Sequence, residues 1–331
     1  MARIFLTFSP QARKNYYSDR ALVGLKALGE VALNDADHAL DTLELIEAAR
    51  GCEFIVSDRQ TPGDGQLFRN LPDLVVFSRC AVDIRNVDVA AASECGILVT
   101  RASAGFMTSV AEWVIGVMID SSRRISESVL AYRAGESAIP VMGRELKGST
   151  LGVIGYGAIG RRLCELALAL GMRVVFADPG ATADDPRLTR LGFEALLETS
   201  DFVVCLAPAN AETENMFDAK AFERMKPTAF FVNASRGNLV DESALERALD
   251  NGLIAGCALD VGRAPDQMPT PRLARHRKVI ATPHVGGLTP QSAEHQALET
   301  VDQVAALLRR DVPTGAVNAD QATRLARLRS R

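Results

Sequence analysis

Two residues have both the chemistry and the setting of catalytic side chains, Arg236 and His284. Arg236 stands between the apolar run 229–233 and Gly237, a poor place for an ordinary solvated arginine. Its guanidinium can polarise a carbonyl and hold a carboxylate through two parallel hydrogen bonds. His284 follows Thr282-Pro283, and an imidazole titrates near neutrality, which suits proton exchange with a hydroxyl. The alternatives are an arginine that ties down its own loop and a buried structural histidine.

A glycine-rich turn between two apolar runs indicates a dinucleotide site. Residues 150–154 form a short apolar run of the kind found in strands buried on both faces, and Gly155, Gly157 and Gly160 follow it. In this setting the first glycine permits a tight turn, the second lets a pyrophosphate approach the backbone, and the third packs helix against strand. The helix that starts here offers free N–H groups to the phosphates. For the three glycines alone, a flexible loop is the alternative.

The choice of dinucleotide depends on Asp178, which ends the next apolar run, 173–177. It lies about 20 residues beyond the glycines, where a carboxylate accepts hydrogen bonds from the adenosine ribose hydroxyls. The same carboxylate would repel a 2′-phosphate. The sequence therefore predicts NAD as the cofactor in preference to NADP.

Strand and helix patterns alternate on both sides of the glycine turn, which predicts an α/β protein with doubly wound parallel sheets. Ligands of such sheets bind outside the carboxyl ends of the strands. Four candidates follow predicted strands, and these are Pro208, Arg236, Asp260 and His284. Residues 107–132 are predicted to form one long helix. Its apolar residues cover more than one face, so we expect it to be buried between domains or subunits.

Composition excludes several classes of function. The chain has 331 residues, enough for two domains, with 47% hydrophobic and 24% charged residues. Its formal net charge of −4 gives no attraction to nucleic acid or an anionic membrane, and no apolar run approaches a membrane span. The six cysteines lack the spacing of a metal site, so we expect reduced thiols, no metal and a cytoplasmic location.

Several motifs together resemble the D-isomer-specific 2-hydroxyacid dehydrogenase family. They are Val110-Ala111-Glu112, Leu146-Lys147-Gly148 running into the glycine turn, Asn233-Ala234-Ser235-Arg236-Gly237, Ala258-Leu259-Asp260-Val261, and Thr282-Pro283-His284-Val285-Gly286-Gly287. The likeness covers nearly the whole chain. It implies an NAD-dependent enzyme that transfers a hydride between the cofactor and a small 2-hydroxy or 2-keto acid.

The resemblance also implies the domain organisation. A Rossmann cofactor domain, residues 102–287, would be inserted in a flavodoxin-like substrate domain formed by residues 1–101 and 288–331. The family is usually dimeric through its cofactor domains. We therefore expect a homodimer, with the predicted helix 107–132 at its interface.

Site residues follow from the same resemblance. Arg236 would bind and polarise the substrate, and His284 would be the acid/base. Cofactor contacts are expected from Gly155, Gly157, Ala158, Ile159, Gly160, Asp178, Pro208, Ala234, Arg236, Asp260, His284, Gly286 and Gly287. Substrate contacts are expected from Arg79, Val82, Asp83 and Arg236.

The chain departs from the family pattern at two places. The family's catalytic glutamate, which orients the histidine, is matched by Ala264, and Asp266 and Gln267 are the nearest candidates to replace it. In the substrate loop, Asp83 stands where glycine is usual. Its carboxylate would repel an anionic substrate if it faced the site, and would do no harm if it pointed to solvent.

Two other functions stay open because of these departures. One is a dehydrogenase of the same fold with a changed substrate and altered proton chemistry, marked by Ala264. The other is a non-catalytic NAD(H)-binding regulatory protein. Retention of both Arg236 and His284 argues against the second, since a binding module needs neither.

Overall fold

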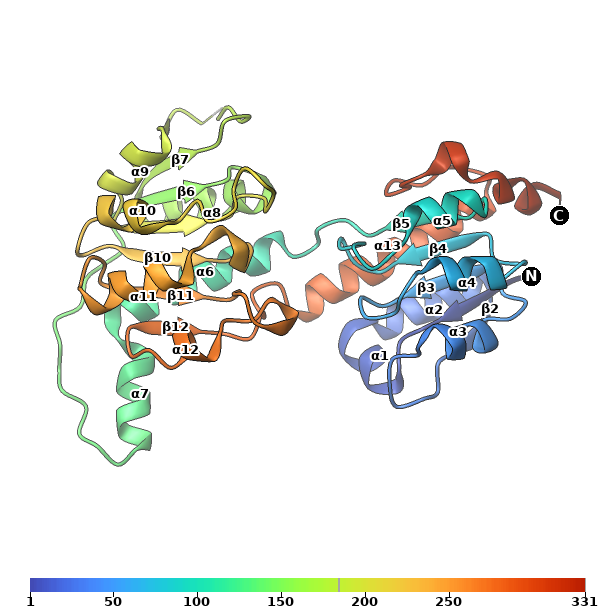
Figure 1. Cartoon of the computed structure of the whole chain (residues 1–331), viewed down its shortest axis with the longest axis horizontal. Coiled ribbons are helices and arrows are strands. Elements are labelled where there is room, and N and C mark those ends of the chain that lie inside the picture. The colour runs from blue at the N-terminus through green and yellow to red at the C-terminus, as the bar shows by residue number, and fades with distance from the viewer. Residues whose placement is uncertain (184, 331) are drawn as a thin grey trace. The chain divides into compact units, whose positions relative to one another are not determined.

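The computed structural model describes residues 1–183 and 185–330, apart from the side chains of Asp266, Arg329 and Ser330. The chain divides into two compact units (Figure 1). The first is formed by Met1–Gly105 with Thr289–Arg331, and the second by Phe106–Leu288. Within the described residues, no helix combines the length and the apolar character that a membrane span requires.

The first unit is built on a five-stranded parallel sheet with the order β2-β1-β3-β4-β5. Its strands are β1 (Ala2–Leu6), β2 (Gly29–Leu33), β3 (Phe54–Ser57), β4 (Val76–Arg79) and β5 (Leu98–Arg101). Its α-helices are α1 (Pro10–Tyr16), α2 (Asp19–Leu28), α3 (Thr42–Ala48), α4 (Gly65–Asn70), α5 (Val89–Glu94) and α13 (Pro290–Leu308). Two 3₁₀ segments, η3 (Ala319–Gln321) and η4 (Thr323–Ser330), follow α13.

Apolar side chains cover both faces of this sheet. Along β1, Ile4 and Leu6 pack in one core with α2 and α13, whereas Phe5 packs in a second core with α3, α4 and α5. The helices begin at polar caps, and Asp41 and Glu44 form a complete capping box at the start of α3. Burial of both faces explains why the strands read as nearly continuous apolar runs.

The second unit contains a seven-stranded parallel sheet with the order β12-β11-β10-β9-β6-β7-β8. Its strands are β6 (Thr150–Ile154), β7 (Arg173–Ala177), β8 (Leu188–Arg190), β9 (Phe202–Cys205), β10 (Phe230–Asn233), β11 (Gly256–Leu259) and β12 (Val279–Ala281). Its helices are α6 (Met107–Arg123), α7 (Ile125–Arg133), α8 (Ala158–Ala169), α9 (Phe193–Thr199), α10 (Ala219–Arg224), α11 (Glu242–Asp250), α12 (Pro271–Ala274) and the 3₁₀ turns η1 (Gly237–Leu239) and η2 (Pro265–Gln267).

Strand order reverses beside β6, because β7 and β8 lie on one side of it and β9 to β12 on the other. Helices α6 and α8 pack on one face of the sheet, and α9, α10 and α11 pack on the other. Together the two parallel sheets with helices on both faces confirm the predicted α/β fold. A ligand is expected outside the carboxyl ends of β6 and β9, where the order reverses.

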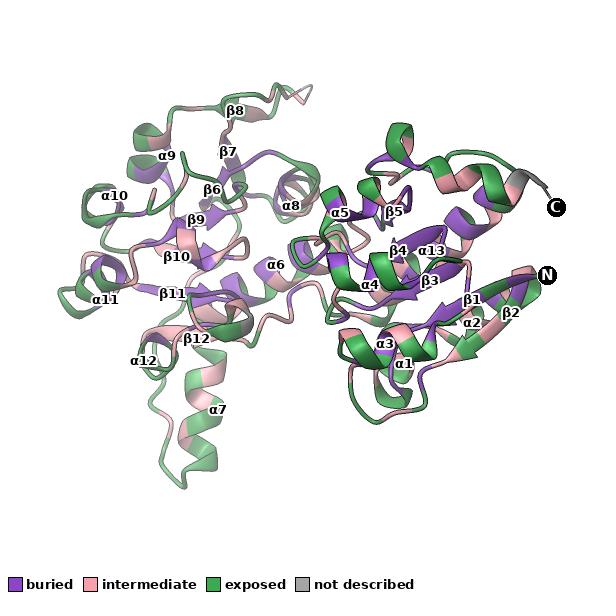
Figure 2. Cartoon of the chain, turned by 45° about the vertical axis from the view of Figure 1, so that its right-hand side comes forward, coloured by how far each residue is buried: buried purple, intermediate pink, exposed green. Residues whose placement is uncertain are grey.

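The single helix predicted for residues 107–132 is wrong, because the chain breaks at Arg124. Arg124 adopts the left-handed conformation, with φ 51°, and ends α6. The Asp120 carboxylate then accepts from the backbone N–H of Ser126 at 2.8 Å and starts α7. In Figure 1 α7 projects from the body of its own unit. None of its residues is buried (Figure 2).

Candidate active site

The glycine turn after β6 has the geometry that the sequence predicts for it. Gly155 has φ 96°, and a Cβ atom there would lie 2.6 Å from the backbone nitrogen of Ala207. A Cβ atom on Gly160 would lie 2.3 Å from the carbonyl oxygen of Gly155, so this glycine lets α8 pack against the turn. At Gly157, in contrast, a Cβ atom would meet nothing within 4 Å. The outer side of the turn is therefore open to a ligand.

The N-terminus of α8 is suited to a dinucleotide pyrophosphate. Gly157 is the N-cap residue, and no side chain caps the first turn of this helix. The N–H groups of the first turn can therefore donate hydrogen bonds to an anion, and the helix dipole favours a negative charge there. These features fit NAD, because they leave both space and donors where its phosphates would bind.

Asp178 lies at the end of β7 beside this turn. Its Oδ2 accepts from the backbone N–H of Tyr156 at 2.8 Å, and its Oδ1 accepts from that of Gly180 at 2.9 Å. These bonds hold the carboxylate in place. An ionised carboxylate has about four acceptor positions, so it retains capacity for ribose hydroxyls.

The end of β9 packs directly against the glycine turn. Residues 206–207 supply the backbone atoms that exclude a side chain at Gly155. The Ser235 hydroxyl, after β10, donates to the carbonyl oxygen of Ala207 at 2.5 Å. The segment that contains Pro208 is thus joined to the one that contains Ala234 and Arg236. Three predicted site segments meet at one edge of the sheet.

The Asn233 side chain stabilises the turn that carries Arg236 through hydrogen bonds to its backbone. The Asn233 side-chain amide donates to the carbonyl oxygen of Arg236 at 2.9 Å and accepts from the backbone N–H of Ser235 at 3.0 Å. Arg236 itself is partly buried, and its Nη1 donates to the Ser235 carbonyl oxygen at 2.7 Å. Gly237 is required here, because a Cβ atom would lie 2.1 Å from the backbone of Gly262.

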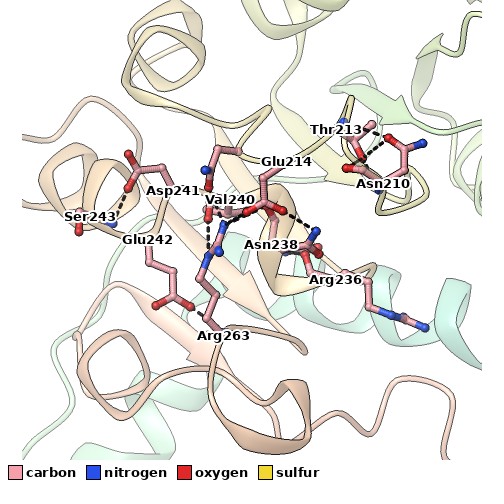
Figure 3. A network of polar contacts seen from close by, with 12 residues as sticks. Asn210, Thr213, Glu214, Arg236, Asn238, Val240, Asp241, Glu242, Ser243 and Arg263 are labelled. Atoms are coloured by element: carbon pink, nitrogen blue, oxygen red, sulfur yellow. Dashed lines mark hydrogen bonds and ion pairs between the residues drawn. The ribbon is translucent and has the colours of Figure 1, made fainter. Parts of the chain in front are cut away.

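Arg263 joins this turn to the loop after β11 (Figure 3). Its guanidinium donates to the carbonyl oxygens of Asn238 at 2.9 Å and Val240 at 3.2 Å, and to Glu214 Oε1 at 3.0 Å. Its backbone N–H donates to Glu242 Oε1 at 3.0 Å. The Arg236 side chain extends away from this network in Figure 3. Arg263 therefore stabilises the backbone around Arg236 and leaves that guanidinium directed elsewhere.

Asp260 organises the turn that carries His284. Asp260 is only 3% exposed, and its Oδ1 accepts from the Thr282 hydroxyl at 2.6 Å and the Val285 N–H at 2.8 Å. Its Oδ2 accepts from the Gly286 N–H at 2.7 Å. His284 adopts a left-handed conformation with φ 55°, rare for a residue with a side chain. The buried carboxylate thus stabilises a backbone conformation that is strained for a residue with a side chain.

The ends of three adjacent strands are connected through their backbones. The Asp260 N–H donates to the Asn233 carbonyl oxygen at 3.1 Å, and the His284 N–H donates to the Asp260 carbonyl oxygen at 2.9 Å. These residues end or follow β10, β11 and β12, which are neighbours in the sheet. The Arg236 and His284 turns are therefore fixed to one rigid edge.

The loop that contains Ala264 takes a compact form. The Ala264 N–H donates to the Met268 carbonyl oxygen at 3.1 Å, and the 3₁₀ turn η2 follows. The Gln267 side-chain oxygen is buried and has no hydrogen-bond partner among the described residues. The Asp266 side chain lies outside the described residues. Whether either residue replaces the family glutamate stays a prediction.

In the first unit, Arg79 ends β4 and directly precedes the predicted substrate loop. It is fully buried, and its Nη2 donates to the Thr61 carbonyl oxygen at 2.8 Å and to Asn86 Oδ1 at 2.9 Å. Within the described residues its Nε and Nη1 have no partner. Burial lowers the pKa of Arg79 to about 10, and the Asp58 and Asp83 carboxylates oppose this fall. The guanidinium is therefore still charged at neutral pH.

Val82 and Asp83 lie in the loop after Arg79. Both are partly buried, and the Asp83 carboxylate is bound by Arg85. Arg59, Asp83, Arg85 and Asn86 line a small surface pocket at this loop. The Asp83 side chain therefore neither points freely to solvent nor stands without a counter-charge.

The sequence did not single out three supporting residues, Asn233, Thr282 and Arg263. Asn233 and Thr282 lie inside motifs that were recognised for their neighbours. Arg263 contacts residues up to 49 positions away, so no local pattern marks it. Only its place two residues before the proline at 265 offered a signal.

Comparison with known proteins agrees with this geometry. The family model described as D-isomer specific 2-hydroxyacid dehydrogenase, NAD binding domain, matches residues 115–286. A glyoxylate reductase from Korarchaeum cryptofilum is 31% identical over 284 residues, which cover 83% of this chain and 86% of that protein. The chain belongs to the D-isomer specific 2-hydroxyacid dehydrogenase family. Residues 115–286 lie within its NAD-binding domain.

Other relatives differ in length from this chain. D-3-phosphoglycerate dehydrogenase 3 of Arabidopsis thaliana is 34% identical over 301 residues, which cover 89% of this chain but 51% of that protein. The chain thus spans about half the length of this relative. The solved structure of D-lactate dehydrogenase from Escherichia coli superposes with a TM-score of 0.81 at 24% identity and covers 96% of this chain and all of that chain. At this identity the likeness shows the fold.

Proposed function

We propose that the protein is an NAD-dependent oxidoreductase that interconverts small 2-keto acids and 2-hydroxy acids. The observation that carries the proposal is the connected edge of β10, β11 and β12, which holds an arginine turn and a left-handed histidine turn beside the glycine turn. A pure binding module has no use for a histidine held in a strained conformation. The names of the relatives point to the same reaction class.

The chemistry needs a hydride donor, a proton donor and a cation for the substrate. NADH supplies the hydride when it is bound. His284 gives a proton to the carbonyl oxygen of the keto acid, and takes one from the hydroxyl in the reverse direction. Arg236 holds the substrate carboxylate and polarises the carbonyl through its planar guanidinium. Asp260 positions His284 through the turn that it binds.

The cofactor would be held by three segments. Gly155, Gly157 and Gly160, with Ala158 and Ile159 at the start of α8, receive the pyrophosphate, and Asp178 receives the adenosine ribose. Residues at the ends of β9, β10, β11 and β12 line the rest, and these are Pro208, Ala234, Arg236, Asp260, His284, Gly286 and Gly287. Asp260 acts mostly through its backbone, because its carboxylate oxygens are bound to the turn.

Taken by itself, the first unit offers the backbone amides of Val82 and Asp83 as its proposed binding group for a carboxylate. Arg79 stays among the proposed substrate contacts of this unit: it is fully buried, and its Nε and Nη1 have no partner within the described residues. Its bonds to Thr61 and Asn86 fix the two segments that flank the loop.

We further propose a homodimer that works in the cytoplasm. Ile125, Val129 and Tyr132 recur at helical spacing along α7 and are each more than 40% exposed, as is Leu130. Such an apolar helix face favours burial against a second copy. All six cysteines are free thiols, as expected in a reducing compartment.

The test is a panel of keto and hydroxy acids, assayed in both directions with NAD(H) and NADP(H). The assays test reduction of glyoxylate, pyruvate, hydroxypyruvate and 3-phosphohydroxypyruvate, and oxidation of the matching hydroxy acids. NADH-dependent reduction of at least one keto acid supports the proposal. NADH binding without turnover of any acid would favour the regulatory alternative. Turnover that survives His284→Ala would favour the altered proton chemistry that Ala264 marks.

A further inference from the structure

Within the described residues, the Asp83 carboxylate of the predicted substrate loop accepts its hydrogen bonds from Arg85. Arg85 Nε lies 2.9 Å from Asp83 Oδ1 and 3.1 Å from Oδ2, and its Nη2 lies 2.6 Å from Oδ2. The Arg85 backbone N–H also donates to Oδ1 at 3.0 Å. The Asp83 side chain is 22% exposed and that of Arg85 is 67% exposed, so the arginine covers the carboxylate from the solvent side.

This pair keeps the Asp83 carboxylate ionised to a lower pH than an ordinary aspartate. The hydrogen bonds from Arg85 lower the pKa of Asp83 to about 2, against a smaller opposing effect of burial. Asp83 is therefore ionised at any pH at which an enzyme of this kind would be assayed. A negative charge on this loop, next to amides proposed to receive a carboxylate, would weaken substrate binding if nothing offset it.

Asn86, which lines the same pocket as the pair, is held by its own hydrogen bonds. Asn86 accepts from the buried Arg79 guanidinium, and its amide donates to the carbonyl oxygens of Arg59 at 3.2 Å and Thr61 at 3.3 Å. Arg59 lines the same pocket as Asp83 and Arg85. The two exposed arginines outweigh the one carboxylate, so the pocket has a net positive charge of one (two minus one).

We propose that Arg85 masks the charge of Asp83 and so permits an aspartate in a loop that binds an anionic substrate. Arg85 is thus a positioning residue for substrate affinity, and it contacts neither the cofactor nor the reacting atoms. This inference rests on the proposed function, since that function places the substrate carboxylate at this loop. It explains how the chain tolerates Asp83 where its family usually has glycine.

The test is a double-mutant cycle on binding. Arg85→Gln, Asp83→Asn and the double variant would be titrated with oxamate and oxalate in the presence of NADH, by calorimetry. These two keto-acid analogues have nearly the same shape but carry one and two negative charges. Because Coulomb energy scales with charge, Arg85→Gln should weaken oxamate roughly tenfold and oxalate roughly a hundredfold. Asp83→Asn should tighten both, because the pocket gains net positive charge.

Rescue is the decisive outcome. The double variant should bind both analogues within roughly threefold of the wild type, because the charge to be masked has gone. Equal losses for oxamate and oxalate, or no rescue in the double variant, would overturn the proposal and indicate a purely structural role. If Arg85→Gln fails to fold by circular dichroism, Arg85→Lys replaces it, with a smaller loss that Asp83→Asn again reverses.

The chain contains a matched control in its other unit. Arg187 binds Asp185 with almost the same geometry, at 2.9, 3.2 and 2.6 Å, but no predicted site residue lies in that pair. Arg187→Gln should leave both affinities unchanged. Keto-acid turnover by the wild type is measured separately, so an inactive wild type that still shows the charge-dependent cycle refutes the proposed function alone. A wild type that binds neither analogue overturns the masking proposal.

Discussion

Asp260 connects the backbone segments that carry Arg236 and His284, the two proposed catalytic residues. Its carboxylate accepts three hydrogen bonds from the turn of His284, and its backbone joins that turn to the strand that precedes Arg236. A carboxylate with so little exposure is stable only because both oxygens have donors. The position of the histidine is therefore determined by a residue on a neighbouring strand.

Among single residues, Asp178 is the one that we expect to determine the choice between NAD and NADP. We expect the enzyme to prefer NADH, and Asp178→Asn to lower the ratio of kcat/KM for NADH over NADPH by at least about tenfold, because removing a like charge beside a 2′-phosphate is worth about 1.4 kcal/mol or more. Asparagine keeps one acceptor for the Tyr156 or Gly180 N–H, so the turn should stay intact. Both cofactors are compared with one accepted keto acid. A wild type that prefers NADPH would exclude this role for Asp178.

Arg236→Lys tests the planar two-point contact. The ammonium keeps the charge but loses the fork of donors, so kcat/KM should fall roughly 10²- to 10³-fold, the size found on removing a transition-state donor. Folding should be unchanged, because Asn233 holds this turn through the Arg236 backbone carbonyl and not through the guanidinium. Thermal unfolding and NADH titration are the controls. Activity close to that of the wild type would remove Arg236 from the catalytic residues.

At the level of secondary structure, Asp201 stabilises the second sheet at the amino-terminal ends of its strands, opposite the glycine turn. Its Oδ2 accepts from the Thr150 N–H at 2.8 Å, at the start of β6, and its Oδ1 accepts from Lys226 Nζ at 3.0 Å. Burial acts to raise the pKa of Asp201, but these donors outweigh it and lower the pKa below its ordinary value of 3.8. The bonds tie β6 to the turn before β10.

This arrangement predicts an acid-sensitive contribution to stability. A carboxyl group with a lowered pKa stabilises the fold above its unfolded value of about 3.9, and the contribution is lost as the pH falls through the folded value. Asp201→Asn should lower the free energy of unfolding by about 1 kcal/mol at pH 7 and by less at pH 3. Urea unfolding at both pH values measures the difference. An equal loss at the two pH values would contradict the assignment.

Much of the second unit could be predicted from sequence because its signals are local. Gly155, Gly157 and Gly160 lie within six residues, between two apolar runs, and Gly155 and Gly160 meet the steric demands expected of them. The break of the predicted helix at Arg124 could not be read, because a left-handed residue leaves no mark in apolar periodicity. The complete burial of Arg79 was equally hidden, since it depends on bonds to residues that local patterns do not connect.

At the scale of the whole molecule, α7 and its exposed apolar face lead to a prediction of assembly. Leu130 is 64% exposed, and we expect Leu130→Glu to weaken a homodimer by at least about thirtyfold, as loss of an interface hot spot would. Val23→Glu on α2, at a site 68% exposed, is the matched control and should leave the dimer unchanged. Sedimentation over a range of concentrations gives the dissociation constants. A wild type that sediments as a monomer throughout would rule out the dimer.

Hydride transfer to the carbonyl carbon of a 2-keto acid can be followed by isotope labelling. The wild-type protein would be incubated with glyoxylate, or another accepted keto acid, and NADH deuterated at both C4 positions of the nicotinamide. We expect one deuterium at C2 of the hydroxy acid for each NADH consumed, measured by nuclear magnetic resonance and mass spectrometry. NADH oxidation that leaves C2 without deuterium, or no reduction of any keto acid tried, would contradict it.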